Sequence, residues 1–346
     1  MPLRTVDKRT RILNNLPEEI PVTGDKGYLL SDVKTGKISM DDFVAQLSVD
    51  ELEAVSRGTL EGMGSSLGAE GNAGVFGGTE KSLREKGVPC ICTNDGPSGV
   101  RLRAHTTLMP NGVALASTFN EELVTALTKE LGKEVRDRGS MVLLAPGMNI
   151  HRHPLCGRNF EYFSEDPVLT GRMASAYVKG VQAAGASATV KHFACNNQEV
   201  NRKKNDSRLS ERALREIYLK GFELCLENGK PDCLMTSYNK INGEWAYNSF
   251  DLATQILRKE WQYDGCVMTD WWIVHNKCSY FKDVRDHAYR IRAHVNVFMP
   301  GADNFGKYKN KVDGSVAEAI ASKNGITIGE LQYNAKRVLT FCLKYL

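Results

Sequence analysis

The chain has 346 residues, of which 42% are hydrophobic and 25% charged, and its formal net charge at pH 7 is +4. These values are ordinary for a globular protein with a large core. The densest basic run, residues 202–204, is followed by Asn205 and Asp206, so we interpret it as a solvated loop and expect no nucleic-acid partner.

The nine cysteines are scattered, and several lie within apolar runs, where free thiols act as small hydrophobic side chains. We therefore expect reduced thiols and a cytoplasmic location. No pair of C-x-x-C units is present, so a structural zinc site is disfavoured and no cofactor is predicted. The N-terminus lacks the apolar segment of a signal peptide, and no run of about 18 apolar residues occurs, so export and membrane insertion are not expected.

The opening stretch differs in pattern from the rest of the chain. Two helices are predicted there, over residues 39–47 and 49–56, and a Gly-rich stretch follows over residues 62–74. Because this stretch neither follows a strand nor opens a helix, we interpret it as a rim loop and not as a phosphate cradle. We assign residues 1–60 to an N-terminal connector that packs on a barrel, and residues 61–346 to the barrel domain.

From about Val88 onward, short β-branched runs alternate with amphipathic stretches, which is the pattern of βαβ units. Helices are predicted to start near Asn120, Ser164, Ser210 and Ser249, and a closing helix is predicted over residues 328–346. Strands are predicted at residues 89–93, 113–117, 141–145, 188–191, 233–237, 265–269 and 295–299.

Seven such strands predict an α/β fold of the TIM-like (β/α)8 class, with one strand irregular. The alternative is an open doubly wound sheet, which concentrates its ligand crevice at one switch point. Polar residues here follow nearly every strand, and this favours the barrel.

The strongest candidate for a reactive group is Asp270, which ends the apolar run 265–269 and precedes Trp271 and Trp272. An acid at the end of a buried parallel strand lies at the rim where α/β proteins keep their chemistry. Asp95 ends another strand within a Gly-Pro turn, where plain turn chemistry explains it equally well.

Other strand ends carry groups suited to binding. Arg158 has a planar guanidinium suited to hydroxyls or carboxylates. Lys191 and His192 close the strand 188–191, and both can face a barrel mouth if the backbone bends there; the alternative is a core histidine beside a snorkelling lysine. Met235, Tyr238 and Trp271 offer apolar and aromatic faces, and such faces above polar clamps suit a sugar ring.

The motifs DGPSGVR, NIHRHPLCGRNFEYFSEDP, KHFACNNQE, RALREIYLKGFE, MTSYNKING and EWQYDGCVMTDWW occur in this order over residues 87–301. This set closely resembles the barrel domain of glycoside hydrolase family 3, the β-glucosidase-like family. The resemblance implies that Asp270 is the nucleophile and that Asp95, Arg158, Lys191 and His192 hold the sugar hydroxyls. It further implies that Met235, Tyr238 and Trp271 line the subsite where the bond breaks and its neighbour.

The resemblance implies a retaining β-glycosidase, above all a β-glucosidase, that releases terminal non-reducing β-linked sugars by double displacement. Lys191, Arg158 and His192 are expected to favour the ionised form of Asp270. The acid/base glutamate comes, in most of the family, from a second α/β domain, and we do not expect these 346 residues to include that domain. A single-domain branch uses an Asp-Ser-His motif instead, but the chain reads Asp206-Ser207-Arg208, so we reject that branch.

The stretch 20–40 resembles the connector of circularly permuted family members, in which the second domain precedes the barrel. We therefore expect one half of a permuted β-glucosidase, with a β-glycoside as substrate and a second domain or chain as partner. Glu161, Glu165 and Glu199 are the in-chain alternatives for the acid, and we expect none of them to serve.

Two other functions stay open. A non-catalytic carbohydrate-binding or scaffold subunit would explain the missing acid. A metal-dependent amidohydrolase is the remote alternative, because the ligand types of that class are present in His151, His153, Lys191, His192 and Asp270. However, the H-x-H pair follows the wrong strand for that class, and Lys191 and His192 are adjacent instead of on separate strands.

Overall fold

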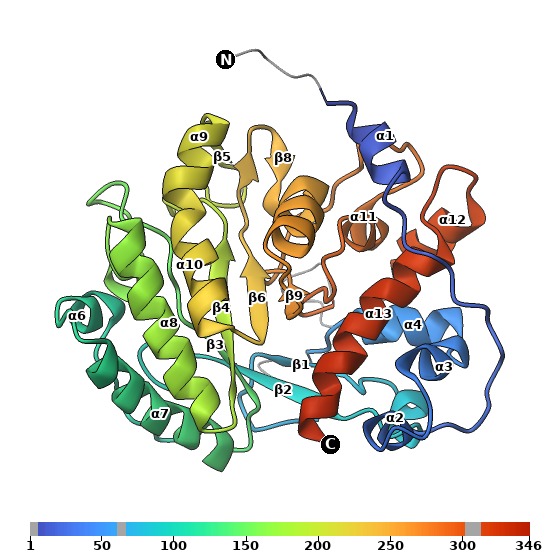
Figure 1. Cartoon of the computed structure of the whole chain (residues 1–346), viewed down its shortest axis with the longest axis horizontal. Coiled ribbons are helices and arrows are strands. Elements are labelled where there is room, and N and C mark those ends of the chain that lie inside the picture. Colours follow the sequence, from blue (N-terminus) through green and yellow to red (C-terminus); the bar gives the residue numbers. More distant parts are fainter. Residues whose placement is uncertain (1–5, 61–66, 302–312) are drawn as a thin grey trace.

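The curled sheet at the centre of the computed structural model is flanked by helices on both sides (Figure 1). The structure describes residues 6–60, 67–301 and 313–346. Its strands are β1 (Gly74–Gly77), β2 (Cys90–Asp95), β3 (Val142–Leu144), β4 (Ser187–Phe193), β5 (Asp206–Ser207), β6 (Cys233–Thr236), β7 (Lys240–Ile241), β8 (Glu244–Trp245) and β9 (Cys266–Met268).

The α-helices are α1 (Lys8–Leu13), α2 (Leu30–Lys34), α3 (Met40–Ala45), α4 (Val49–Val55), α5 (Lys81–Glu85), α6 (Gly112–Ala116), α7 (Glu121–Asp137), α8 (Pro167–Ala183), α9 (Glu211–Ala213), α10 (Lys220–Gly229), α11 (Asp286–Arg292), α12 (Ser315–Ala321) and α13 (Ile328–Cys342). Two π-helical segments, Leu214–Tyr218 and Asp251–Glu260, and three short 3-10 helices, Asn159–Glu161, Ala246–Asn248 and Leu343–Tyr345, complete the described elements.

The main sheet has the strand order β1-β2-β3-β4-β6-β9. β1 is antiparallel to β2, and the other neighbours are parallel. Two short segments link its two edges: Val297 bridges Met268 of β9, Phe298 bridges Arg57, and Thr59 bridges Val75 of β1. The small sheet β5-β7-β8 lies beyond the carboxyl ends of β4 and β6.

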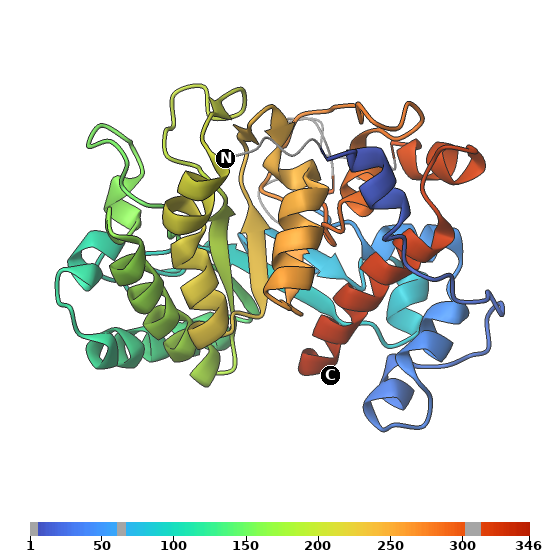
Figure 2. The ribbon, with the colours of Figure 1, turned by 45° about the horizontal axis from the view of Figure 1, so that its top comes forward.

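Helices α7, α8 and α10 cover one side of the sheet, and α13 covers the other together with α3 and α4 (Figures 1 and 2). α7 and α8 approach very closely at Gly180, where an added Cβ would lie 2.0 Å from Thr128 Oγ1 and 2.4 Å from Thr125 O. Glycine is therefore required at this helix crossing, because any side chain would push the two helices apart.

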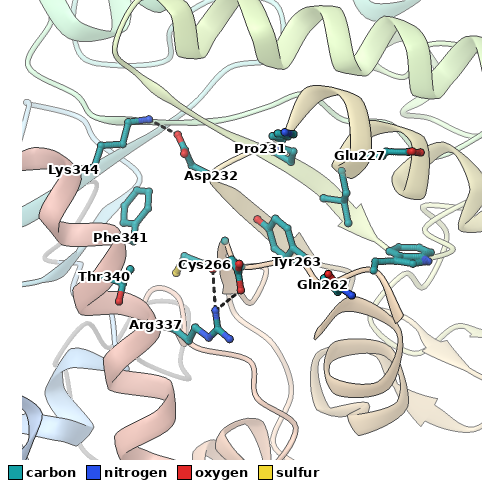
Figure 3. A pocket seen from close by; sticks show the side chains of 15 residues that line it. Glu227, Pro231, Asp232, Gln262, Tyr263, Cys266, Arg337, Thr340, Phe341 and Lys344 are labelled. Carbon is teal, nitrogen blue, oxygen red and sulfur yellow. Dashed lines mark hydrogen bonds and ion pairs between the residues drawn. The ribbon is translucent and has the colours of Figure 1, made fainter. Parts of the chain in front are cut away.

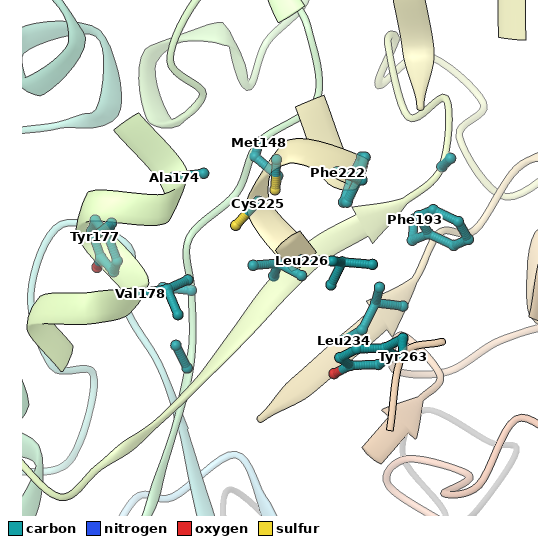
Figure 4. Close-up of a cluster of buried hydrophobic side chains, with 14 of the residues drawn as sticks. Met148, Ala174, Tyr177, Val178, Phe193, Phe222, Cys225, Leu226, Leu234 and Tyr263 are labelled. Atoms are coloured by element: carbon teal, nitrogen blue, oxygen red, sulfur yellow. The ribbon is translucent and has the colours of Figure 1, made fainter. Parts of the chain in front are cut away.

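The core between the sheet and α8 and α10 is made of apolar side chains from both layers (Figure 4). Phe193 at the end of β4 packs edge-on against Phe222 of α10, with ring centroids 5.2 Å apart. Leu234 of β6 is fully buried in the same cluster. This packing fixes β4 and β6, whose carboxyl ends carry several of the predicted site residues.

Most of the predicted elements are observed, and the chain has the α/β fold. The predicted strand at residues 113–117 is wrong: these residues form α6, because Asn111 caps the segment by accepting a hydrogen bond from Ala114 N (3.0 Å) and the alanines favour a helix. The segment 295–299 is joined by single bridges and is the most irregular of the predicted strands. β1 was not predicted, because its four residues begin and end in glycine.

The N-terminal stretch lies against the C-terminal part of the chain. Lys8 and Arg11 of α1 pair with Asp251 (3.2 and 2.7 Å). Further along, Gln332 of α13 exchanges two hydrogen bonds with the backbone of Ile20, at 2.9 and 2.8 Å. Part of the predicted Gly-rich rim loop, residues 62–66, lies outside the described residues. Within the described ranges, no helix is long and apolar enough to cross a membrane.

Candidate active site

One pocket, of about 420 Å³, lies at the carboxyl ends of the parallel strands. All eight predicted site residues line it. The lining residues are Ala73, Asp95, Arg101, Leu144, Arg158, Lys191, His192, Arg202, Met235, Tyr238, Asp270, Trp271 and Trp272. Side chains from β2, β4, β6 and the segment after β9 thus converge on one space, as sheet curvature brings neighbouring strand ends together.

Asp270 is held at the wall of this pocket with one oxygen fixed and the other open. Oδ1 accepts a hydrogen bond from the backbone N–H of Trp271 at 2.7 Å. Oδ2 is buried and has no hydrogen-bond partner among the described residues, and His192 Nε2 lies 3.7 Å from it. A buried carboxylate oxygen without a partner is costly to a fold, so it marks a group kept for binding or reaction.

Burial raises the pKa of Asp270 above its usual value, and this outweighs the Trp271 hydrogen bond and the charges of Arg158 and Lys191, all of which lower it. Arg158 and Lys191 therefore act in the predicted direction. His192 does not, because burial, aided by Arg158 and Lys191, lowers its pKa well below the usual value and leaves it neutral.

His192 is fixed in one tautomer by its neighbours. Arg158 lies with Nη1 3.0 Å from Nε2 of His192, and because a guanidinium can only donate, Nε2 accepts. Nδ1 then carries the proton and donates to the phenol oxygen of Tyr162 at 3.2 Å. Asn149 binds the backbone N–H and C=O of His192 at 2.9 Å each. The placement of Tyr162 and Asn149 behind this imidazole was not predicted, since nothing in their local sequence indicates it.

Lys191 points into the same pocket as His192 because the pairing of β4 with β6 shifts register between Val190 and Phe193. The predicted bend is therefore observed. Lys191 Nζ lies 2.7 Å from Asp95 Oδ1, and Arg101 Nη1 lies 3.2 Å from Asp95 Oδ2. Burial raises the pKa of Asp95, but Lys191, followed by Arg101 and Arg158, more than offsets this, so the net shift is downward.

Aromatic and apolar side chains also line this pocket. Trp271 donates its indole N–H to Ala73 O at 2.7 Å, which anchors the ring beside Asp270. The guanidinium of Arg202 lies 4.7 Å from the centroid of the Tyr238 ring. Burial and the charge of Asp270 raise the pKa of Tyr238, so this phenol stays protonated and can donate.

Arg202 corrects our interpretation of the basic run 202–204 as a purely solvated loop. It lines the pocket and donates from Nη1 to Glu199 Oε2 at 2.9 Å. Arg101, Trp272, Leu144 and Ala73 also line the pocket and were not predicted as site residues. Trp272 could have been included, because it adjoins Trp271, and so could Leu144, because it ends β3. Arg101 and Ala73 reach the site only through the course of their loops.

Two of the three in-chain carboxylates considered as acids form ion pairs. Glu161 pairs with Arg158 Nε, and Glu199 pairs with Arg202 and accepts from Asn196 Nδ2 at 3.0 Å. Neither Glu161, Glu165 nor Glu199 lines the pocket that holds Asp270. His151 and His153 do not line it either. Across the described ranges, no group of three or more His, Cys, Asp or Glu side chains could hold a metal ion.

A larger hollow of about 610 Å³ lies at the other end of the sheet, where β6 and β9 begin (Figure 3). It contains none of the predicted site residues. Four of its charged side chains form two ion pairs, Lys344 with Asp232 and Arg337 with Asp264, the latter at 2.8 Å. Self-paired charges at the amino ends of strands are typical of stability and not of chemistry.

A profile described as glycosyl hydrolase family 3 N terminal domain matches residues 69–341. A β-glucosidase of Ruminococcus albus is 48% identical over 344 residues, which cover 99% of this chain and 36% of that protein. β-Glucosidase A of Butyrivibrio fibrisolvens is 44% identical over 259 residues, which cover 73% of this chain and 30% of that protein. The chain thus spans about a third of the length of these curated relatives.

The solved structures similar to this chain are also β-glucosidases. A β-glucosidase from Paenibacillus barengoltzii superposes with a TM-score of 0.92 and 46% identity, covering 99% of this chain and 37% of that one. β-Glucosidase 3B from Thermotoga neapolitana, solved in complex with glucose, superposes with a TM-score of 0.78 and 37% identity, covering 88% of this chain and 42% of that one.

Proposed function

Because the chain belongs to glycoside hydrolase family 3, we propose that it is the nucleophile-bearing part of a retaining β-glycosidase, and most simply of a β-glucosidase. One observation carries the proposal. Oδ2 of Asp270 is buried without a hydrogen-bond partner among the described residues, at a pocket lined by charged side chains that form ion pairs and by aromatic side chains. A sugar ring needs this combination, because its C–H faces are apolar while its hydroxyls require hydrogen bonds.

In the proposed reaction, Oδ2 of Asp270 attacks the anomeric carbon and forms a glycosyl-enzyme that water then hydrolyses, with net retention. The hydrogen bond from Trp271 to Oδ1 orients the attacking oxygen. Asp95, Arg158, Lys191 and His192 bind the sugar hydroxyls. Met235, Tyr238 and Trp271 line the faces of the bound ring. Neutral His192 accepts from Arg158, and it is positioned by Tyr162 and Asn149.

The same reaction needs a second carboxyl group, about 5 to 5.5 Å from the nucleophile, to protonate the leaving oxygen. Glu161 and Glu199 are ion-paired and lie outside the pocket lining, which supports a source beyond this chain. We infer that a second α/β domain or chain supplies this glutamate, as in a circularly permuted relative.

The fold supports a closed barrel. Bridges through Arg57, Thr59, Val297 and Phe298 link the two edges of the six-stranded sheet, and with these two segments the ring would have the eight members of a (β/α)8 barrel. We propose that residues 1–60 are the connector and residues 61–346 the barrel domain, with the segment around Arg57 as the point where the connector enters the ring.

All nine cysteines are free in the structure, and eight of them are buried. Unpaired buried thiols are typical of proteins that work in a reducing compartment, and they support the prediction of a cytoplasmic location.

A non-catalytic carbohydrate-binding subunit is the second candidate, and the ion-paired state of Glu161 and Glu199 is the observation that favours it. Such a subunit would bind sugars through the same pocket and would remain inactive with any partner. The two candidates therefore differ in whether turnover can be restored.

Complementation tests the proposal. The chain is mixed with the portion of the Ruminococcus albus relative that it does not cover, and hydrolysis of p-nitrophenyl β-glucoside is measured. We expect turnover only in the mixture, and its loss in Asp270→Ala. Asp264→Ala is the matched control, because this carboxylate is exposed, precedes the same strand and should leave turnover unchanged. If the two components associate but the mixture hydrolyses nothing, the result would favour the non-catalytic subunit.

A further inference from the structure

Arg202 reaches the pocket that holds Asp270 from the loop after β4. Its side chain is 36% exposed, and its guanidinium pairs with Glu199, whose side chain is 21% exposed, at 2.9 Å. A pair with this much solvent contact contributes little order by itself, because water competes for both partners. Whatever fixes Glu199 therefore also helps to hold Arg202 over the Tyr238 ring, 4.7 Å from its centroid.

The side chain of Asn196 binds Glu199 from the interior of the protein. Asn196 is 1% exposed, and its Nδ2 donates to Glu199 Oε1 and to the phenol oxygen of Tyr162, at 3.0 Å each. An amide nitrogen carries two hydrogens, so these two bonds use both of them. Turning the amide around would set its oxygen against the carboxylate of Glu199, so the two bonds also fix which way the amide faces.

The Tyr162 end of this contact is part of a buried framework. The phenol oxygen of Tyr162 also accepts from Nδ1 of His192 at 3.2 Å, and His192 is bound in turn by Arg158 and by Asn149. Asn196 thus ties the loop carboxylate of Glu199 to the groups that already hold the other arginine of the pocket.

The oxygen of the same amide has a different environment. Oδ1 of Asn196 is buried and has no hydrogen-bond partner among the described residues. A buried oxygen of this kind is a cost to the fold. The cost is offset at the same side chain by the two donors, and this indicates that Asn196 is present for its N–H groups.

We propose that Asn196 is a positioning residue, which holds the guanidinium of Arg202 in the pocket by anchoring Glu199 to Tyr162. Asn196 does not line the pocket itself, so it acts on a bound sugar only through Arg202. Loss of its two N–H groups leaves Glu199 without its buried anchor, and Arg202 can then turn towards solvent. The inference rests on the proposed function, because it takes Arg202 to serve sugar binding.

Affinity for methyl β-glucoside tests this role in the whole chain without requiring turnover. Binding is followed through the fluorescence of Trp271 and Trp272, which line the pocket. The variants Asn196→Ala and Arg202→Ala and their combination form a double-mutant cycle.

Asn197→Ala is the matched control. This neighbouring asparagine is 3% exposed and also has a buried Oδ1 without a partner among the described residues. Its Nδ2 donates instead to the backbone oxygen of Ile150, at 2.6 Å. Asn197→Ala should therefore lower stability and leave sugar affinity unchanged.

We expect Arg202→Ala to weaken binding, and Asn196→Ala to weaken it by about threefold to tenfold, as the net contribution of one hydrogen bond implies. The double variant should bind no more weakly than Arg202→Ala, because Asn196 acts through Arg202. Asn196→Asp fills nearly the same volume, but its carboxylate cannot donate to Glu199, so it should not restore the affinity.

Independent effects of Asn196→Ala and Arg202→Ala in the cycle, or an equal loss in Asn197→Ala, would overturn the positioning role. Wild-type affinity in Arg202→Ala, Asn196→Ala or Asn196→Asp would overturn it as well. If Asn196→Ala does not fold, Asn196→Asp takes its place in the cycle. Absence of binding by the wild type would overturn the proposed function and, with it, this role.

Discussion

Replacing Lys191 by methionine tests whether the pocket is built on a buried charge pair. The ammonium lies 2.7 Å from Asp95 Oδ1, and the Lys191 side chain is 4% exposed against 33% for Asp95. Removing one member of a fully buried pair costs about 3–5 kcal/mol. In the variant, Asp95 stays partly exposed to solvent and retains its ion pair with Arg101 at 3.2 Å. We therefore expect Lys191→Met to lower the free energy of unfolding by about 2 kcal/mol.

A double-mutant cycle with Asp95→Asn, followed by urea unfolding at pH 7, measures the coupling directly. The matched control is the exposed pair Lys37 and Asp32, at 3.1 Å with side chains 68% and 18% exposed. That control should give less than about 1 kcal/mol. A coupling between Lys191 and Asp95 no larger than that of the control would refute the reasoning.

The pH dependence of this loss has a definite sign. The pKa of Asp95 is lowered in the fold, chiefly by Lys191 acting against burial. The stabilisation by the pair is therefore present at neutral pH and is lost as the pH falls through the lowered pKa. The difference in stability between the wild type and Lys191→Met should accordingly shrink on acidification.

Two further predictions concern the nucleophile and the packing. Arg158→Gln removes a charge that lowers the pKa of Asp270, so the acidic limb of the rate of covalent labelling by an activated fluoro-glucoside should move to higher pH; an unmoved limb would contradict the electrostatic account. Gly180→Ala should lower stability by about 1–3 kcal/mol in thermal unfolding, because its Cβ would meet Thr128 at 2.0 Å, whereas Gly157→Ala, 3.9 Å from its nearest atom, should cost little.

The strand ends were predictable because a short apolar run and the polar residue that ends it are both visible in the local sequence. The apolar run 265–269 ends at Asp270, and the structure places that acid after β9, in one pocket with Asp95 and Lys191. The prediction of a strand at residues 113–117 was wrong because it rested on the same local signal. A short apolar run fits either a strand or a buried helix, and the decisive group was the cap at Asn111.

The parts of the site that could not be predicted depend on tertiary placement. Tyr162 reaches His192 from a loop thirty positions earlier, and Arg202 returns to the pocket from the loop after β4. The pKa of His192 also escaped prediction, because burial decides it and burial is not visible in the local sequence. Residues of this kind need the fold before their roles can be assigned.

The central claim is that Asp270 is a nucleophile, and trapping the covalent intermediate tests it most directly. The chain is exposed to a 2-deoxy-2-fluoro-β-glucoside with a good leaving group, alone and with the complementing portion of a relative, and the adduct is mapped by mass spectrometry of its peptides. We predict a single fluoroglucosyl group on Asp270, which is absent in Asp270→Ala. No adduct under either condition, or an adduct on another carboxylate, would contradict the account.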